Sequence, residues 1–156
     1  MEAFFLPPLA SMDAPSASMP DWLARLDPLP LECNGMSRLV AAVLTQYEIG
    51  FQAYVGALEV EGVGRISLHW WIELPDDRIV DLRARMWLDT SMQVPHGIVT
   101  PSDQVRYLRA KPLARAELAL HPSVFALMTG HTIESVMPTA TEVMVSLKAL
   151  RAASPA

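Results

Sequence analysis

The sequence predicts an α+β protein in which a helix carrying the single cysteine packs on a small antiparallel sheet, with extra helices at the C-terminal end. Three observations lead to this prediction. Apolar residues recur at helical spacing between residues 36 and 47, and β-forming residues dominate residues 51–83. Short helical patterns separated by prolines then return from residue 101 onward.

Composition limits the class of protein. With 156 residues, 51 % of them hydrophobic, the chain can bury the core of one domain. We divide it into a proline-rich arm over residues 1–30 and one catalytic-type domain over 31–156, with a core over 31–90 and a helical extension over 101–152. The net charge of −5 argues against a nucleic-acid partner. The nearest approach to a basic cluster is Arg78, Arg83 and Arg85, which lie among acidic and apolar neighbours.

Targeting and redox features are few. The chain begins Met1-Glu2, its first apolar stretch stops at Pro7-Pro8, and no apolar run is long enough to cross a membrane. We therefore expect a cytoplasmic protein with no membrane partner, although export without a classical signal would look the same. One cysteine allows neither an intramolecular disulfide nor a cysteine-rich zinc site, and we expect no metal and no cofactor.

The N-terminal elements place the cysteine. Residues 20–26 fit a short helix with Trp22 and Leu26 on its buried side. The stronger helix follows, and Cys33 and Asn34 stand at or just before its first turn. Unpaired N–H groups and the positive dipole end at a helix N-terminus favour the thiolate form of a cysteine.

A hairpin is expected next, after a β-rich segment over residues 51–60. Residues 66–74 predict a strand, 75–77 a turn and 79–83 the partner strand, with a possible further strand over 84–88. One strand face carries His69 with Ser67, Trp71 and Glu73. The other is uniformly apolar and is expected to be the core side, formed by Ile66, Leu68, Trp70, Ile72 and Leu74.

Asp81 is the residue that fits a structural strand least. A carboxylate among Ile79, Val80 and Leu82 is unfavourable unless it has a partner. His69 and Asp81 share a face only if the loop between their strands holds an odd number of residues, because faces alternate with period two. A two-residue turn would separate them; we predict the odd loop.

The C-terminal part predicts helices over residues 123–129 and 141–151. The remaining histidines are interpreted as loop residues: His96 in a Pro-His-Gly turn, His121 before a proline and His131 after a glycine. A histidine within a strand is most often structural, so His69 becomes a candidate through its polar face and its expected neighbour.

The order of these elements resembles transglutaminase-like and papain-like cysteine peptidases, most closely the compact bacterial type. The matching residues are Cys33-Asn34-Gly35-Met36-Ser37-Arg38-Leu39, His69-Trp70-Trp71-Ile72-Glu73-Leu74 and Arg78-Ile79-Val80-Asp81. The resemblance covers about residues 30–85. It implies a papain/transglutaminase-like core and a thiol hydrolase or acyltransferase that acts on an amide or peptide bond of a peptide or protein substrate.

The resemblance also implies roles. Cys33 would be the nucleophile, His69 the general base and then acid, and Asp81 the residue that orients the imidazole. Trp71 would shield the imidazole–carboxylate bond from water; the alternative is an aromatic side chain on the strand surface that packs on the arm. Papain has a glutamine shortly before its cysteine for the oxyanion hole, and residues 26–32 contain none. The backbone N–H of Cys33 would supply one donor, with Asn34 a candidate for the other.

Other interpretations remain open. Cysteine, histidine and aspartate also bind metals, but the chain lacks His-Glu-x-x-His, Cys-x-x-Cys and close histidine pairs. A non-catalytic binding module with the same fold would use the arm and exposed tryptophans. A transglutaminase or deamidase acting on a protein partner would use the same three residues. The sequence leaves the substrate and the oligomeric state open.

Overall fold

The computed structural model describes residues 17–88 and 90–152, with side chains up to Lys148. It is an α+β protein with one antiparallel sheet and several helices, as the sequence predicts. Residues 1–16, the first half of the predicted arm, lie outside the described residues.

The described part of the chain contains a six-stranded sheet in the order β1-β5-β4-β3-β2-β6, and every adjacent pair is antiparallel. Its strands are β1 (Ala17–Ser18), β2 (Gln52–Val60), β3 (Gly64–Glu73), β4 (Ile79–Asp81), β5 (Gly97–Val99) and β6 (Val105–Pro112).

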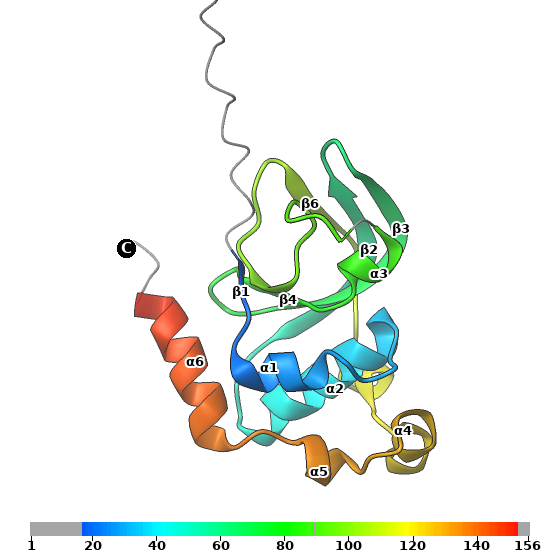
Figure 1. Cartoon of the computed structure of the whole chain (residues 1–156), viewed down its shortest axis with the longest axis vertical. Coiled ribbons are helices and arrows are strands. Elements are labelled where there is room, and N and C mark those ends of the chain that lie inside the picture. The colour runs from blue at the N-terminus through cyan, green and yellow to red at the C-terminus, as the bar shows by residue number, and fades with distance from the viewer. Residues whose placement is uncertain (1–16, 89, 153–156) are drawn as a thin grey trace, which may run out of the picture.

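Most helices gather on one side of this sheet, whereas the short α3 lies against its other side (Figure 1). The helices are α1 (Asp21–Leu26), α2 (Cys33–Gln46), α3 (Ala84–Trp87), the 3₁₀ turn η1 (Arg115–Leu118), α4 (Pro122–Thr129), α5 (Ile133–Val136) and α6 (Ala140–Ala152). None of the helices among the described residues is both long and apolar enough to cross a membrane.

The β3–β4 hairpin has the odd loop that the sequence predicts. Glu73 pairs with Ile79, which leaves five residues between the two strands. Within the loop the Asp77 N–H donates to Leu74 O at 3.0 Å, and Asp77 adopts a left-handed φ of 66°, a conformation that aspartate tolerates. Because Ile72 pairs with Val80, His69 and Asp81 point to the same face of the sheet.

The predicted alternation along β3 is wrong at one point. Gly56 pairs with His69 but Leu58 pairs with Ile66, so two residues of β3, Ser67 and Leu68, oppose one residue of β2. This β-bulge turns Ile66 to the face of His69 and leaves Leu68 72 % exposed. Strict period-two reading of the sequence had placed both on the core side.

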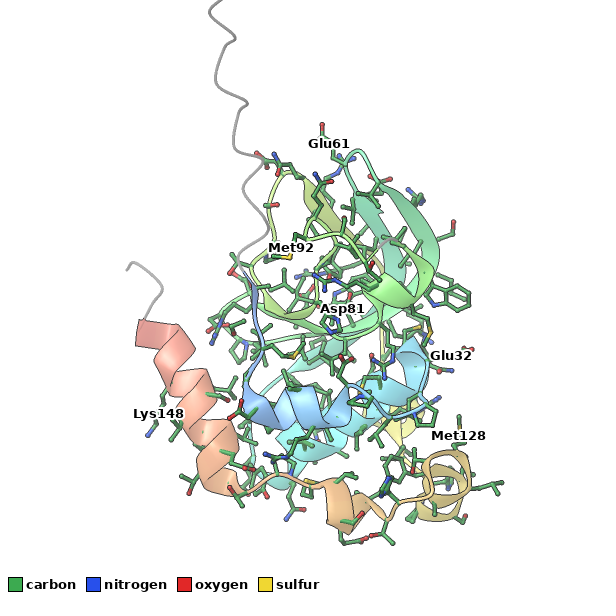
Figure 2. The ribbon with its side chains drawn as sticks, in the orientation of Figure 1. Glu32, Glu61, Asp81, Met92, Met128 and Lys148 are labelled. Atoms are coloured by element: carbon green, nitrogen blue, oxygen red, sulfur yellow. The ribbon has the colours of Figure 1, made fainter. Side chains whose placement is uncertain are left out.

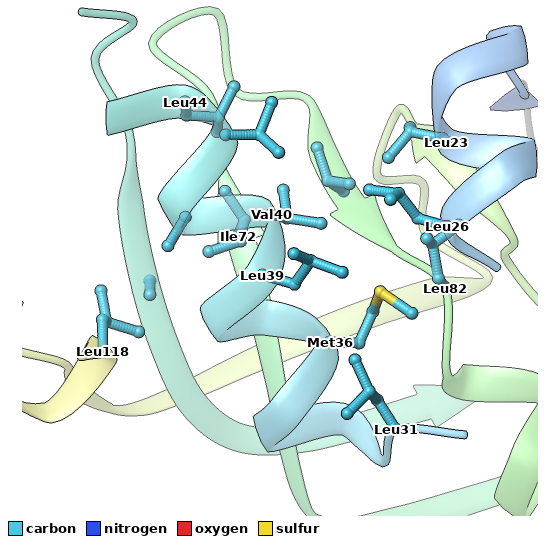
Figure 3. Close-up of a cluster of buried hydrophobic side chains, with 14 of the residues drawn as sticks. Leu23, Leu26, Leu31, Met36, Leu39, Val40, Leu44, Ile72, Leu82 and Leu118 are labelled. Carbon is cyan, nitrogen blue, oxygen red and sulfur yellow. The ribbon is translucent and has the colours of Figure 1, made fainter. Parts of the chain in front are cut away.

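Both faces of the sheet are buried, which also differs from the prediction of a single core face. On one face, Ile72 and its neighbours pack against α2 and α1 (Figure 3). The other face encloses a second apolar cluster containing Leu58, Val60, Ile66, Ala84, Val94 and Val105. His69 lies on this second face and is fully buried.

The second cluster is enclosed because the sheet curls. Tyr107 on β6 donates a hydrogen bond to Asp81 on β4, although β3 and β2 lie between them in the strand order. Three strand spacings in a flat sheet would be about 14 Å, farther than a tyrosine side chain reaches. Strong twist and the bulges in β3 and between Val55 and Gly56 bring the two strands together.

Three segments differ from the sequence prediction. Residues 101–152 are not helical throughout, because residues 105–112 form edge strand β6. Residues 84–88, expected as a strand, form α3, whose first N–H groups are capped by Asp81. The second half of the arm is part of the core: Trp22 and Leu26 are buried as predicted, and they pack in the same cluster as α2.

Candidate active site

Cys33 is the first residue of α2 and is half-buried. Glu32 before it is extended, and the first α-helical hydrogen bond runs from the Met36 N–H to Glu32 O at 2.8 Å. The N–H groups of Cys33 and Asn34 therefore precede the hydrogen-bond ladder of the helix. The thiol stands where these donors and the positive end of the helix dipole meet.

His69 and Asp81 form a buried pair. His69 Nε2 lies 2.8 Å from Asp81 Oδ2, and the two side chains are 0 % and 1 % exposed. Asp81 lies in the interior of the molecule, whereas Glu32, beside the cysteine, is at the surface (Figure 2). The hairpin register described above produces the contact, since it places the two residues on one face twelve positions apart.

All acceptor positions of the Asp81 carboxylate are used. Oδ1 accepts the backbone N–H groups of Arg83 at 2.9 Å and Ala84 at 3.1 Å. Oδ2 accepts His69 Nε2 and the Tyr107 hydroxyl, each at 2.8 Å. A buried carboxylate with this many donors is stable as an anion.

The pair carries charge on both members. Burial lowers the pKa of His69, but the charge and hydrogen bond of Asp81, with a smaller contribution from Cys33, outweigh it and raise the pKa to about 10. Burial raises the pKa of Asp81, but the imidazolium and the donors around the carboxylate outweigh it and leave that pKa below its usual value. At neutral pH the site therefore holds an imidazolium beside a carboxylate.

The Cys33 side chain is among the groups that raise the pKa of His69. Nε2 is hydrogen-bonded to Asp81, so Nδ1 is the ring nitrogen that remains available. Nδ1 is buried and has no hydrogen bond of ordinary geometry among the described residues.

β3 and β4 are paired over a short stretch near the site, at Ile72–Val80 and Glu73–Ile79, and Asp81 then pairs with Gly97 of β5. β3 and β4 are therefore unpaired at His69. A cavity of about 10 Å³ between α2 and these strands is lined by residues that include Cys33, Trp70 and Asp81, and is too small to hold a peptide.

Trp71 packs against the His69 ring of the buried pair. It is 0 % exposed, so the alternative of a surface aromatic is wrong. Its ring stacks on His69 at 6.3 Å between centroids and contacts Tyr107 at 5.1 Å. Gly56, paired with His69, makes room: an added Cβ would lie 2.9 Å from the Trp71 ring and 2.0 Å from Leu108 O.

Asn34 is exposed and is not among the residues lining the cavity. Its Oδ1 accepts the N–H of the next residue, Gly35, at 2.7 Å, so its side chain is engaged locally in the first turn of α2. The structure thus brings together Cys33, His69, Asp81 and Trp71, and leaves Asn34 at the rim.

Two residues beside the site were not expected. Tyr107 was missed because the sequence suggested helix after residue 101, although Val105, Tyr107 and Arg109 alternate as in a strand. Arg83 is buried and joins the site to the segment before Cys33. Its guanidinium donates to the carbonyls of Asp27, Leu29, Leu31 and Leu82 and to the Asp27 carboxylate.

Other features of the described residues lie apart from this chemistry. A hollow of about 700 Å³ lies at the C-terminal half of α2 and is lined by residues that include Tyr47, Phe51 and Arg115. Within the described ranges, no group of three or more His, Cys, Asp or Glu side chains is placed to hold a metal ion.

Comparison with known proteins finds no family model, no curated protein and no solved structure that matches the chain.

Proposed function

We propose that this protein is a thiol-dependent enzyme that transfers or hydrolyses an acyl group at an amide or peptide bond, on a papain/transglutaminase-like core. The observation that carries the proposal is the fully buried His69–Asp81 pair, whose imidazole has the Cys33 side chain among the groups that raise its pKa. His96 Nδ1, like His69 Nδ1, is buried without a hydrogen bond among the described residues, but the His96–Asp27 pair is partly exposed and its carboxylate is shared with Arg83.

In the proposed reaction, Cys33 and His69 each act once while the thioester forms and once while it is broken down. The Cys33 thiolate attacks the carbonyl carbon, and the N–H of Cys33 holds the developing oxyanion. The His69 Nδ1–H then protonates the leaving nitrogen as the C–N bond breaks, which leaves a thioester and a free amine. In the second half Nδ1 takes a proton from water, whose oxygen attacks the thioester; the thiolate leaves with the acid as product. An amine in place of water gives transamidation.

Alkylation of Cys33 tests the proposal without a known substrate. A Cys33 thiol activated by His69 should react with iodoacetamide at about pH 6.5, where an ordinary thiol reacts slowly. We expect His69→Gln to slow this reaction at least about tenfold, measured by mass spectrometry. The matched control is His96→Gln, which removes a histidine from another histidine–carboxylate pair. Equal slowing of alkylation by both variants, or an unreactive thiol in the parent chain, contradicts the proposal that the protein is a thiol-dependent enzyme and favours a binding module.

A second assay separates the two acyl acceptors. A glutamine-containing peptide is incubated with a fluorescent primary amine, and peptide labelling and ammonia release are followed together. Labelling indicates transamidation, ammonia without labelling indicates deamidation, and cleaved peptide indicates hydrolysis. None of these with a reactive Cys33 would mean that the thiol is activated for a different substrate.

A further inference from the structure

Tyr107 reaches the Asp81–His69 pair from the far edge of the sheet. Its hydroxyl donates to Asp81 Oδ2 at 2.8 Å, the same oxygen and the same distance as the His69 contact. The curled sheet makes this contact, because β6 pairs with β2 and is not adjacent to β4. The Tyr107 ring is fixed against Trp71.

The hydroxyl is a permanent donor. Burial, and then the negative charge of Asp81, raise the pKa of Tyr107 well above its ordinary value, so it keeps its proton at any pH at which the protein would work. The other donors to Asp81, the N–H groups of Arg83 and Ala84, bind Oδ1. Tyr107 is therefore the group among the described residues that competes directly with His69 for one carboxylate oxygen.

This competition matters for proton transfer. An imidazolium held by a buried carboxylate releases its proton reluctantly, and His69 must release one to the leaving nitrogen in the reaction proposed above. A neutral O–H that points its positive end at Oδ2 reduces the negative potential at His69.

We propose that Tyr107 is a positioning residue that, by sharing Asp81 Oδ2 with His69, weakens the stabilisation of the imidazolium by the carboxylate and so eases release of the Nδ1 proton. The catalytic meaning of this contact rests on the proposed function, whereas the contact itself acts on His69 whether or not Cys33 reacts.

The test is the titration of His69 followed by ¹H–¹⁵N NMR of its imidazole, assigned by its loss in His69→Gln. Tyr107→Phe keeps the ring and removes the donor, so we expect the titration midpoint of His69 to rise by about half to one pH unit. The matched control is Tyr54→Phe, which removes a hydroxyl from a ring that also stacks on Trp71. We expect that control to leave the midpoint unchanged.

A second variant moves the midpoint the opposite way. In a Tyr47→Phe, Tyr54→Phe background, fluorotyrosine can be incorporated at residue 107 alone; its more acidic O–H is a stronger donor, and the midpoint of His69 should fall. An unchanged or lowered midpoint in Tyr107→Phe, or an equal rise in Tyr54→Phe, overturns the proposal.

Cys33 alkylation keeps this result separate from the proposed function. Alkylation needs the thiolate but no proton from His69, so Tyr107→Phe should alkylate within about twofold of the parent rate. Slow alkylation of Cys33 in the parent chain would contradict the proposed thiol-dependent activity. The titration midpoint of His69 would still report on the contact with Tyr107. A reactive thiol with an unmoved midpoint would overturn the role of Tyr107 alone.

Discussion

The described part of the chain contains two histidine–carboxylate pairs with nearly the same geometry and different surroundings. His69 Nε2 lies 2.8 Å from Asp81 Oδ2, and His96 Nε2 lies 2.9 Å from Asp27 Oδ2. The first pair is 0 % and 1 % exposed, whereas the second is 20 % and 31 % exposed. Water screens the second pair, and its carboxylate is shared with Arg83. Distance alone therefore does not distinguish the two pairs; burial and the remaining partners of each carboxylate do.

The two pairs are joined through one residue. The Arg83 N–H binds Asp81, while its guanidinium binds Asp27. The exposed pair thus helps to hold the segment that leads into α2, and the buried pair holds the charge beside the thiol. Four predictions, from the largest expected effect to the smallest, test whether the two pairs have these different roles.

Asp81→Ala should have the largest effect. It leaves a buried imidazolium and the Tyr107 hydroxyl without their acceptor, and we expect the free energy of unfolding in urea to fall by about 3–5 kcal/mol. Asp27→Ala, in the screened pair, should cost about 1–2 kcal/mol. Equal losses for the two variants would mean that burial does not distinguish the pairs.

Arg83→Met should follow. The substitution keeps an apolar stem but leaves the carbonyls that the guanidinium binds without a donor, so we expect a loss of about 3 kcal/mol in the same urea experiment. Because the segment before α2 loses its anchor, alkylation of Cys33 should also change. A variant as stable as the parent would show that water replaces the guanidinium at no cost.

The two pairs should also differ in how they make the free energy of unfolding depend on pH. The folded pKa of His69 is raised to about 10, so the folded state keeps a proton that the unfolded state loses near pH 6.5. The free energy of unfolding should fall as pH rises through this window, by up to about 1.4 kcal/mol per pH unit. His69→Gln should flatten that slope, and His96→Gln should preserve it. Parallel slopes in the parent and His69→Gln would contradict the charged state of the buried pair.

His96→Gln should have the smallest effect on stability, below about 1 kcal/mol, because its contact with Asp27 is partly exposed. Thermal unfolding measures this change. A loss as large as that of Asp81→Ala would show that the second pair also supports the core.

The sequence predicts what depends on local pattern. Cys33 at a helix start and the odd hairpin loop that puts His69 and Asp81 on one face both follow from residues within one or two elements. Asp81 is unfavourable in a strand without a partner, and this indicated that a partner such as His69 lies beside it.

Features set by pairing between distant segments were not predictable in the same way. The bulge at Ser67 and Leu68 depends on the register with β2, and the curl of the sheet depends on β6. β6 carries Arg106, Arg109 and Lys111, whose exposed charges mask its strand character. For that reason the sequence predicted neither the contact of Tyr107 with Asp81 nor the burial of His69.

The hairpin origin of the His69–Asp81 pair has a consequence for the order of folding. Its members are 12 residues apart, whereas Tyr107 is 26 residues beyond Asp81. Cys33 is farther still from His69 and comes from a separate helix. Closing a short loop costs less entropy and occurs sooner than closing a long one. We expect pulsed hydrogen exchange to protect β3 and β4 before β6 and the start of α2, so the charge pair would form first and the thiol would join it last.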